Sequence, residues 1–357
     1  MATQEIVTPP SNAAIFLTLQ VATSQSAVDT ARDVLGDISG LTRSVNFRHH
    51  DADLKTVIGI GSDFWDRLTS APRPKSLHPF PTNLVGEKHS APSTPGDILL
   101  HVRAREMGMC WEVVRLVRKA MGDAVTVVDE VHGFRYFDNR DLLGFVDGTE
   151  NPEGSDAEDA VLIGDEDPDY AGGSYVHIQA YTHQMQQWDA LSVEEQERVI
   201  GRTKVDDVEL DDDIKPSNSH VALNDIEDEN GEDADIYRLN MPFASAETGT
   251  EGTFFISYTA DPSITEQMLE NMFIGDPPGN YDRILDFSTA QTGCMFFVPS
   301  VDVLDGIPDL PPAQTQAAEA EEDSEDYSGS ASDIAPAPGK QPHTSDGSLG
   351  IGSLRNL

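Results

Sequence analysis

Apolar positions in the first half of the chain repeat with two different periods. Short runs rich in valine, isoleucine and phenylalanine are typical of strands, whereas apolar residues three or four positions apart are typical of one helix face. These patterns predict strands at 13–21, 44–49, 54–61 and 124–134 and helices at 24–38 and 104–122, which is the order βαββαβ. A proline-rich excursion follows the third of these strands, and the apolar segment 97–103 at its far end is a candidate for the actual pairing.

The same order returns in the second half of the chain. We expect strands at 173–181, 236–241, 253–259 and 294–300 and helices at 192–202 and 263–273, with a long acidic loop after the first helix. A βαββαβ unit forms an antiparallel sheet with its helices on one face. The pattern therefore predicts an α+β protein made of two ferredoxin-like halves that pack as a pseudo-dimer, with a cavity available beside a sheet.

The chain divides into segments of different character. We expect an N-terminal ferredoxin-like half over 1–140, a connector over 141–172 and a C-terminal half over 173–310. Residues 311–345 are rich in proline, alanine, serine and acidic residues and poor in aromatic ones, which is typical of a disordered linker. Aliphatic residues return in the last segment, 346–357, where a linker does not require them.

Composition limits the classes of partner. The chain has 63 acidic and 23 basic residues and a formal net charge of −40, so nucleic acid and anionic lipid would be repelled, although the charge can equally serve solubility or a salty cell. No apolar run approaches the roughly 18 residues of a membrane span. The start of the sequence has no basic leader or cleavage site, so we expect a cytoplasmic protein. Cys110 and Cys294 lie in apolar surroundings and are expected to be buried thiols.

The segment GFVDGTENP, residues 144–152, is the first candidate for chemistry. Asp147 lies close to Gly144 and Gly148, and glycines allow the backbone to approach another group closely. Taken alone, an Asp-Gly pair is more often a turn with a solvated carboxylate. Its meaning therefore depends on the other segments that accompany it.

Two later segments contain the other candidate residues. His220 lies in SNSHVALND among many acids, and one imidazole is enough for an axial haem ligand, whereas the other histidines have no metal-ligand spacing. Eighteen residues later, Arg238 and Asn240 would point to the same face of a strand, where a guanidinium and an amide can polarise a bound peroxide. The ordinary alternatives are a solvated histidine and a surface arginine paired with a nearby acid.

Together these segments resemble the dye-decolourising peroxidase family, in particular its compact bacterial type B, over roughly residues 10–305. The motif GFVDGTENP matches the family signature GxxDG, and further segments look like family segments in the family's order: IGIGSDFWDRL, NSHVAL, RLN, GTFFISY and LDFSTAQTGCMFFVP. The resemblance implies a dimeric α/β-barrel-like fold, which agrees with the two ferredoxin-like halves above. It also implies haem between a sheet and helices.

The resemblance assigns roles on the peroxide side of the haem. Asp147 would be the distal aspartate, Arg238 the distal arginine and Asn240 its polar neighbour. A short carboxylate can move a proton from one peroxide oxygen to the other. A fixed guanidinium can stabilise the negative charge that grows on the departing oxygen.

On the opposite side, the resemblance makes His220 the proximal ligand of the haem iron. Arg202 would hold a haem propionate. The second ring nitrogen of His220 is expected to donate to a carboxylate, which makes the ligand more electron-rich. We choose Asp286 for this carboxylate, with Asp282 as the alternative.

These roles imply a haem-dependent peroxidase, with one haem b per chain, that reduces hydrogen peroxide and oxidises bulky dyes or phenolic electron donors. A homo-oligomer is expected, with a hexamer among the candidate sizes. The alternative is a haem-binding or haem-handling protein with incidental peroxidase activity, and fast reaction with peroxide would separate the two. A third interpretation, an inert body recognised only through its tail, predicts a protein without haem.

The end of the sequence, SDGSLGIGSLRNL, resembles the cargo-loading peptides of encapsulin nanocompartments. Leu349, Ile351 and Leu354 could fill a hydrophobic groove, while Gly350 and Gly352 let an extended backbone lie close to its wall. The ordinary alternative is a frayed terminus. The resemblance implies a peroxidase packaged in the cytoplasm inside a shell of encapsulin protein.

Overall fold

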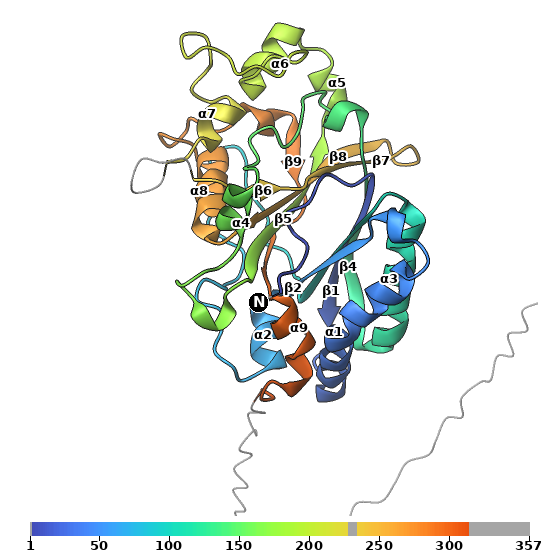
Figure 1. The fold of residues 1–357 in the computed structure, drawn as a ribbon. Coiled ribbons are helices and arrows are strands. Elements are labelled where there is room, and N and C mark those ends of the chain that lie inside the picture. Colours follow the sequence, from blue (N-terminus) through green and yellow to red (C-terminus); the bar gives the residue numbers. More distant parts are fainter. Residues whose placement is uncertain (1, 228–233, 314–357) are drawn as a thin grey trace, which may run out of the picture. The chain divides into compact units, whose positions relative to one another are not determined.

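The computed structural model describes residues 2–227 and 234–313 (Figure 1). The strands are β1 (Ala13–Val21), β2 (Lys55–Gly61), β3 (Ile98–Ala104), β4 (Val125–Phe134), β5 (Ser174–His183), β6 (Tyr237–Arg238), β7 (Met241–Ser245), β8 (Thr250–Thr259), β9 (Ser288–Ala290) and β10 (Cys294–Val298). The α-helices are α1 (Gln25–Asn46), α2 (Ser62–Leu68), α3 (Met107–Met121), α4 (Ser155–Val161), α5 (Met185–Trp188), α6 (Val193–Ile200), α7 (His220–Asn224), α8 (Pro262–Phe273) and α9 (Val301–Asp305).

The first half of the chain has the ferredoxin-like strand order β4-β1-β3-β2, with every pairing antiparallel. Helices α1 and α3 pack against each other and cover one face of this sheet (Figure 1). The central strand β1 is buried on both faces, as a strand between two layers should be, whereas the edge strand β4 alternates buried and exposed positions. Apart from the short helix α2 between β2 and β3, this half has the βαββαβ order, although one of its strands is not the one predicted.

The second half repeats the arrangement with the order β10-β5-β8-β6, while β7 also pairs with β8 and β9 with β5. Helix α8 packs on β5 and β8. Strand β10 pairs with β2, so the two halves share one continuous sheet. The prediction of an α+β fold with two ferredoxin-like halves is confirmed.

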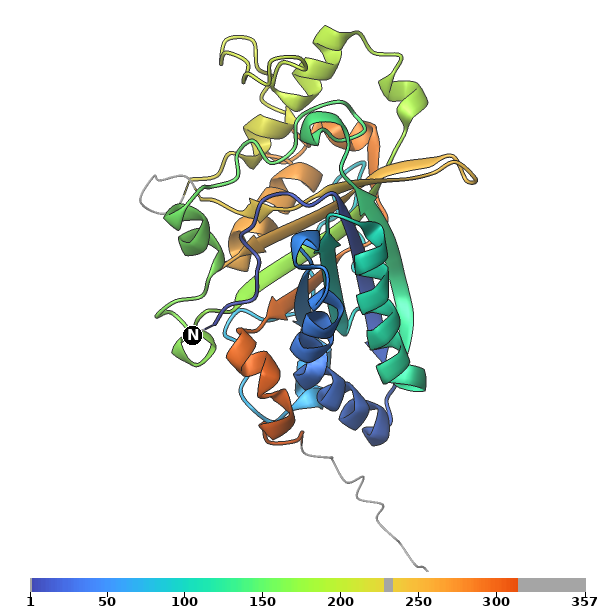
Figure 2. The ribbon, with the colours of Figure 1, turned by 45° about the vertical axis from the view of Figure 1, so that its right-hand side comes forward.

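The sheet curls so that its two halves face each other (Figure 2). Phe16 of the first half stacks on Phe254 of the second, with ring centroids 4.1 Å apart. Strands β4 and β7, which lie near opposite ends of the pairing order, also contact each other. Neighbouring residues such as Ile15 and Phe16 belong to different apolar clusters, so the sheet has one core under its helices and a second between the halves. This closure matches the barrel-like fold that the resemblance implied.

The strand expected at 44–49 is wrong, because α1 continues to Asn46 and is followed by a short 3-10 turn. Leu41 and Val45 pack against the core and extend the apolar stripe that includes Ile38 at helical spacing. The position of the missing strand is taken by the segment expected at 97–103, which forms β3 and pairs with both β1 and β2.

The predicted linker over 311–345 lies almost wholly outside the described residues, and the terminal peptide over 346–357 lies entirely outside them. The proposed boundaries at 140 and 172 stay predictions. Among the described helices, none is long and apolar enough to cross a membrane. Cys110 and Cys294 are free and buried, as expected.

Candidate functional site

A cavity of about 430 Å³ lies in the second half of the chain. Its walls bring together five of the predicted residues, namely Asp147, Arg202, His220, Arg238 and Asn240, whereas Asp286 is not among them. Apolar side chains form much of the remaining surface: Leu143, Ile200, Val221, Ile226, Phe255, Met268, Leu269, Met272 and Ile284. Residues from three separate regions of the sequence thus meet in one apolar space, and that volume lies within the range of ligand-binding pockets.

His220 is the first residue of the short helix α7. Ser219 is its N-cap, and the Ser219 hydroxyl accepts a hydrogen bond from the backbone N–H of Ala222. At the other end, the Asn271 side chain of α8 donates to the carbonyl of Leu223 at 2.9 Å. The helix is therefore held at both ends, and the imidazole has a fixed position on the cavity wall.

The carboxylate beside His220 is Asp282, so the choice of Asp286 is wrong. The Nδ1 atom of His220 donates to Oδ2 of Asp282 at 2.7 Å, and Asp282 is fully buried. The other oxygen of Asp282 accepts from the backbone N–H of Ile284 at 2.9 Å, because Asp282 caps the 3-10 turn Arg283–Asp286. Asp286, at the end of that turn, instead contacts His89 and the hydroxyl of Tyr281.

This hydrogen bond determines which nitrogen of His220 is available. Because Nδ1 donates to a carboxylate, the proton resides there and Nε2 keeps its lone pair. Within the described residues, Nε2 makes no hydrogen bond, and the side chain is 29% exposed at the cavity wall. The ring is thus arranged to bind a group inside the cavity through Nε2.

Asp147 is held by the turn that its glycines allow. Gly144 has a φ of +95° and Gly148 a φ of +81°, which is backbone that favours glycine. A Cβ on Gly144 would also lie only 2.5 Å from the Lys204 side chain. The backbone N–H of Asp147 donates to the carbonyl of Asn139 at 2.9 Å. The loop therefore places the Asp147 carboxylate in the cavity wall.

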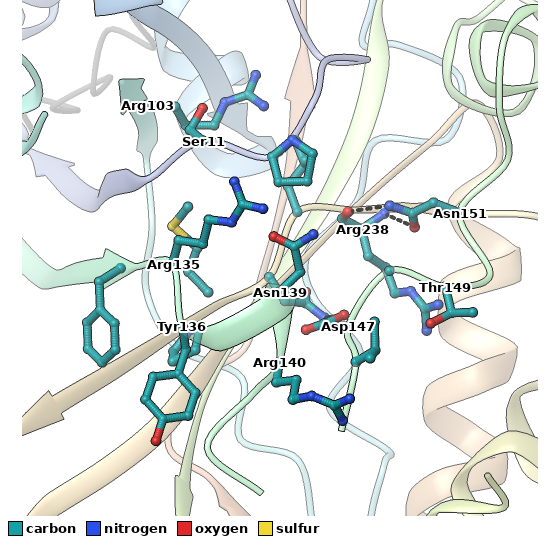
Figure 3. A pocket seen from close by; sticks show the side chains of 18 residues that line it. Ser11, Arg103, Arg135, Tyr136, Asn139, Arg140, Asp147, Thr149, Asn151 and Arg238 are labelled. Atoms are coloured by element: carbon teal, nitrogen blue, oxygen red, sulfur yellow. Dashed lines mark hydrogen bonds between the residues drawn. The ribbon is translucent and has the colours of Figure 1, made fainter. Parts of the chain in front are cut away.

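The GFVDGTENP motif is tied directly to the strand that carries Arg238. The Asn151 side chain donates to the carbonyl of Arg238 at 2.7 Å and accepts from its backbone N–H at 2.9 Å (Figure 3). Asn240 donates to Oδ1 of Asp147 at 3.1 Å and accepts from the backbone N–H of Ile256 at 2.9 Å. The single strand expected at 236–241 is wrong, because Arg238 ends β6 and Asn240 lies between β6 and β7, but both residues line the same cavity.

The guanidinium of Arg238 is not paired with any carboxylate in the described part of the chain. Its Nε atom is buried without a hydrogen-bond partner there. A buried donor without a partner costs free energy, and such a group is often completed by a ligand or water. The surface ion pair that was the ordinary alternative for Arg238 is therefore wrong.

Arg202 lines the cavity but is already engaged by acids. Its Nε donates to Asp207 at 3.0 Å, and one terminal nitrogen forms an ion pair with Glu150, which is mostly exposed. A ligand carboxylate at this place would have to compete with Glu150. The predicted role of Arg202 in binding a propionate stays a prediction.

Three titratable residues of the cavity were not anticipated from the sequence. Burial, and then the nearby charge of Asp147, raise the pKa of Asp141 to about 7, against the effect of backbone hydrogen bonds from Phe145 and Gly144. Burial lowers the pKa of His183 to about 4, and its ring bonds two hydroxyls of neighbouring strands. Burial raises the pKa of Tyr181. Only Asp141 had a sequence signal, since it lies three residues before Gly144.

The arrangement can do two kinds of chemistry. One wall offers an imidazole nitrogen whose basicity is supported by a buried carboxylate, which suits the binding of a metal ion or a metal-containing cofactor. Another region offers a carboxylate and an unpartnered guanidinium, which suit proton transfer and the stabilisation of developing negative charge.

Comparison with known families identifies the two halves. The family model described as Dyp-type peroxidase, N-terminal, matches residues 3–135, and the model described as Dyp-type peroxidase, C-terminal, matches residues 138–303. The dye-decolorizing peroxidase of Rhodococcus erythropolis is 54% identical over 352 residues, which cover 99% of this chain and 96% of that protein.

Two solved structures are similar over most of their length. A variant of DypB from Rhodococcus jostii RHA1 in complex with heme is 56% identical, with a TM-score of 0.83, and the match covers 85% of this chain and 98% of that one. The encapsulated DyP-type peroxidase from Mycobacterium smegmatis, solved by cryo-EM, is 57% identical with a TM-score of 0.83, and the match covers 88% of this chain and 99% of that one.

Proposed function

The chain belongs to the Dyp-type peroxidase family, and we propose that it works with haem b to reduce hydrogen peroxide while it oxidises bulky dyes or phenolic donors. The main support is the meeting, in one cavity, of an imidazole backed by a buried carboxylate and a guanidinium without a partner. The heme-bound DypB relative supports the choice of cofactor.

The residues present fit a haem. The cavity has extensive apolar walls, as a porphyrin ring requires, and Nε2 of His220 is unbonded among the described residues. The orphaned Nε of Arg238 provides a polar atom that a ligand could complete. His220 would hold the iron, and Arg202 would reach a propionate if Glu150 moved aside.

When bound, haem would supply the electrons that cleave the peroxide bond and recover them from the donor. The chain's own residues would prepare both sides of this chemistry. Asp282 holds the proton of Nδ1 and keeps His220 electron-rich. Asp147 would carry a proton between the two peroxide oxygens, and Asn240, which donates to its Oδ1, would fix its orientation. The guanidinium of Arg238 would stabilise negative charge on the departing oxygen.

The test is the reaction of the haem-loaded protein with one equivalent of peroxide, followed by stopped-flow absorption at the Soret band. We expect a fast spectral change that an added donor reverses. Arg238→Leu should slow the change by about 10²-fold, by analogy with the removal of an oxyanion-hole donor. A haem carrier needs no such guanidinium, so an equal rate in both proteins, or slow bleaching without turnover, would refute the peroxidase.

We also propose that this enzyme is loaded into an encapsulin shell through its last residues, which lie outside the described part of the chain. The encapsulated relative from Mycobacterium smegmatis supports this role. Leu349, Ile351 and Leu354 would fill a groove of the shell protein, and Gly350 and Gly352 would let the backbone approach it. A homo-oligomer with several tails could engage several grooves at once, which raises the overall affinity.

Co-expression with a shell protein tests this role. Particles should contain the full-length enzyme, and deletion of residues 347–357 should empty them without loss of peroxidase activity. A matched control deletes the eleven linker residues 325–335, which removes the same length of chain but keeps the peptide. Equal loading of the truncated and full-length proteins would contradict the proposal.

A further inference from the structure

A second, smaller cavity lies beside the first. It has a volume of about 230 Å³ and shares with the first cavity the segment from Val146 to Thr149 and the residues Arg238 and Asn240. Its other residues come from β3 (Arg103), from the end of β4 and the segment that follows it to residue 140, from Asn151, from Leu239 and the start of β7, and from the N-terminal segment at 10–11 (Figure 3). The GFVDGTENP motif is therefore a partition with a cavity on each side.

The charge of this second cavity is opposite to that of the chain. Four arginines line it, namely Arg103, Arg135, Arg140 and Arg238, and Asp147 is the one carboxylate among its described lining residues. The whole sequence has 63 acidic and only 23 basic residues. None of the four arginines forms an ion pair within the described residues, although acids are abundant. The cavity therefore concentrates positive charge that the protein itself does not neutralise.

Two of these guanidinium groups have hydrogen-bond donors without a partner in the described structure. Arg103 is 1% exposed, and among the described residues its terminal nitrogens donate only to the Thr8 hydroxyl and the Glu5 carbonyl. The Nε atoms of Arg103 and Arg238 are both buried without partners in the described structure. Burial lowers the pKa of Arg103, and the nearby tyrosines and the acids Glu5 and Asp53 oppose this effect only in part. A buried cation is costly unless an anion compensates it.

The remaining walls indicate the size and character of a suitable anion. Phe134 and Tyr136 offer aromatic rings beside Arg135, and Met241 and Pro242 add apolar surface. Arg140 is held by the carbonyls of Gly144, Lys204 and Val205, so it is a fixed part of the wall. Arg135 is exposed, and its side chain has no partner among the described residues, so it can meet a ligand at the mouth. The volume, below that of drug-sized pockets, suits one aromatic ring.

We propose that this cavity is a binding site for small aromatic carboxylates. The carboxylate would meet the unpaired guanidinium groups, which match its planar shape and can donate two parallel hydrogen bonds. The ring would lie against Phe134 and Tyr136. Binding here goes beyond the proposed peroxidase activity and does not require turnover, so it can be measured without peroxide.

Isothermal titration calorimetry of the haem-loaded protein with benzoate tests the site. Benzamide has the same ring without the charge, and acetate has the charge without the ring, so both should bind at least about tenfold more weakly. Arg135→Gln should weaken benzoate binding by about tenfold, and Arg135→Glu should weaken it further. Arg48→Gln is the matched control, because Arg48 is also exposed and unpaired among the described residues but lies outside the cavity.

The outcomes separate this site from the peroxidase itself. Benzoate binding that depends on Arg135 supports the site whether or not Arg238→Leu alters the reaction with peroxide. Equal affinities for benzoate and benzamide would overturn the charge recognition, and equal affinities for benzoate and acetate would overturn the role of the rings. Unchanged benzoate binding in both Arg135 variants would place the ligand elsewhere.

Discussion

The two polar regions of the larger cavity differ in how completely their atoms are bonded. On the His220 side, Nδ1 of the imidazole and both oxygens of Asp282 have partners, α7 is fixed at both ends, and only Nε2 is left for a ligand among the described contacts. On the Arg238 side, the guanidinium makes no side-chain hydrogen bond within the described structure. We call the His220 side closed, because a side chain whose hydrogen bonds are already made holds a ligand in one orientation. We call the Arg238 side open, because its unpaired donors can bind a group whose charge changes during a reaction. The difference supports a permanent group at His220 and a transient one at Arg238.

The most direct way to break the closed side is His220→Ala. The cavity would lose its one nitrogen that is backed by a carboxylate, so we expect loss of nearly all stoichiometric haem, at least about 100-fold in affinity. Haem content and the Soret spectrum of the purified protein measure this. His132→Ala is the control, because His132 is an exposed histidine whose partner is Glu130. Full haem content with an unchanged spectrum in His220→Ala would exclude His220 as the ligand.

Replacement of Asp282 and Asp286, one at a time, tests which carboxylate supports His220. Asp282→Asn keeps the shape but loses the charge behind His220, and we expect the rate with peroxide or the haem affinity to fall 10- to 100-fold. Asp286→Asn alters only contacts with His89 and Tyr281 and should leave both within about twofold. A larger effect from Asp286→Asn than from Asp282→Asn would mean that the carboxylate seen beside His220 is not the one that supports it.

This pair of aspartates shows where sequence reasoning reaches its limit. Periodicity was enough for the two ferredoxin-like halves, because strands and helices bury faces with different spacing. The glycines beside Asp147 indicated a close backbone approach, since few residues tolerate a positive φ, but only the accompanying segments and the family resemblance pointed to its role. The choice between Asp282 and Asp286 instead depended on the direction of one 3-10 turn, which no local pattern encodes.

The end of helix α1 and the partners of Arg202 were not predicted for similar reasons. The helical stripe through Leu41 and Val45 was obscured by polar neighbours, and only packing against the core extends α1 to Asn46. Arg202 was placed in the right cavity, but its partners Asp207 and Glu150 come from an acidic loop and from the motif segment. Long-range contacts of this kind follow from the tertiary fold and cannot be derived from spacing alone.

On the Arg238 side of the cavity, Asp147→Ala should reduce the rate with peroxide less than Arg238→Leu does. The carboxylate transfers a proton that water can also carry, so we expect the rate with peroxide to fall by about tenfold. Asn240 would lose one partner but keep its bond to Ile256. Stopped-flow traces of both variants under identical conditions measure the ratio. If Asp147→Ala is slower than Arg238→Leu, proton transfer and not charge stabilisation limits the step.

The smallest expected effect concerns Asp141, which lies in the cavity wall near Asp147. Its pKa of about 7, raised by burial, exceeds the ordinary value of 3.8, so the folded protein retains a proton that the unfolded chain loses. This contribution to stability is complete below pH 4 and is lost as the pH rises to about 7. Above pH 7 a second negative charge also lies near Asp147, so we expect the rate with peroxide to fall a few-fold between pH 5 and 8.

Asp141→Asn isolates this group, because an amide oxygen can still accept from the backbone N–H groups of Gly144 and Phe145. The variant should be less dependent on pH than the original protein, both in the denaturant midpoint and in the rate with peroxide, between pH 4 and 8. The comparison is a difference between two proteins, so the many other carboxylates cancel. Identical pH profiles of the two proteins would show that Asp141 is ionised throughout this range. Protonation of Asp141 would then not stabilise the loop that carries Asp147.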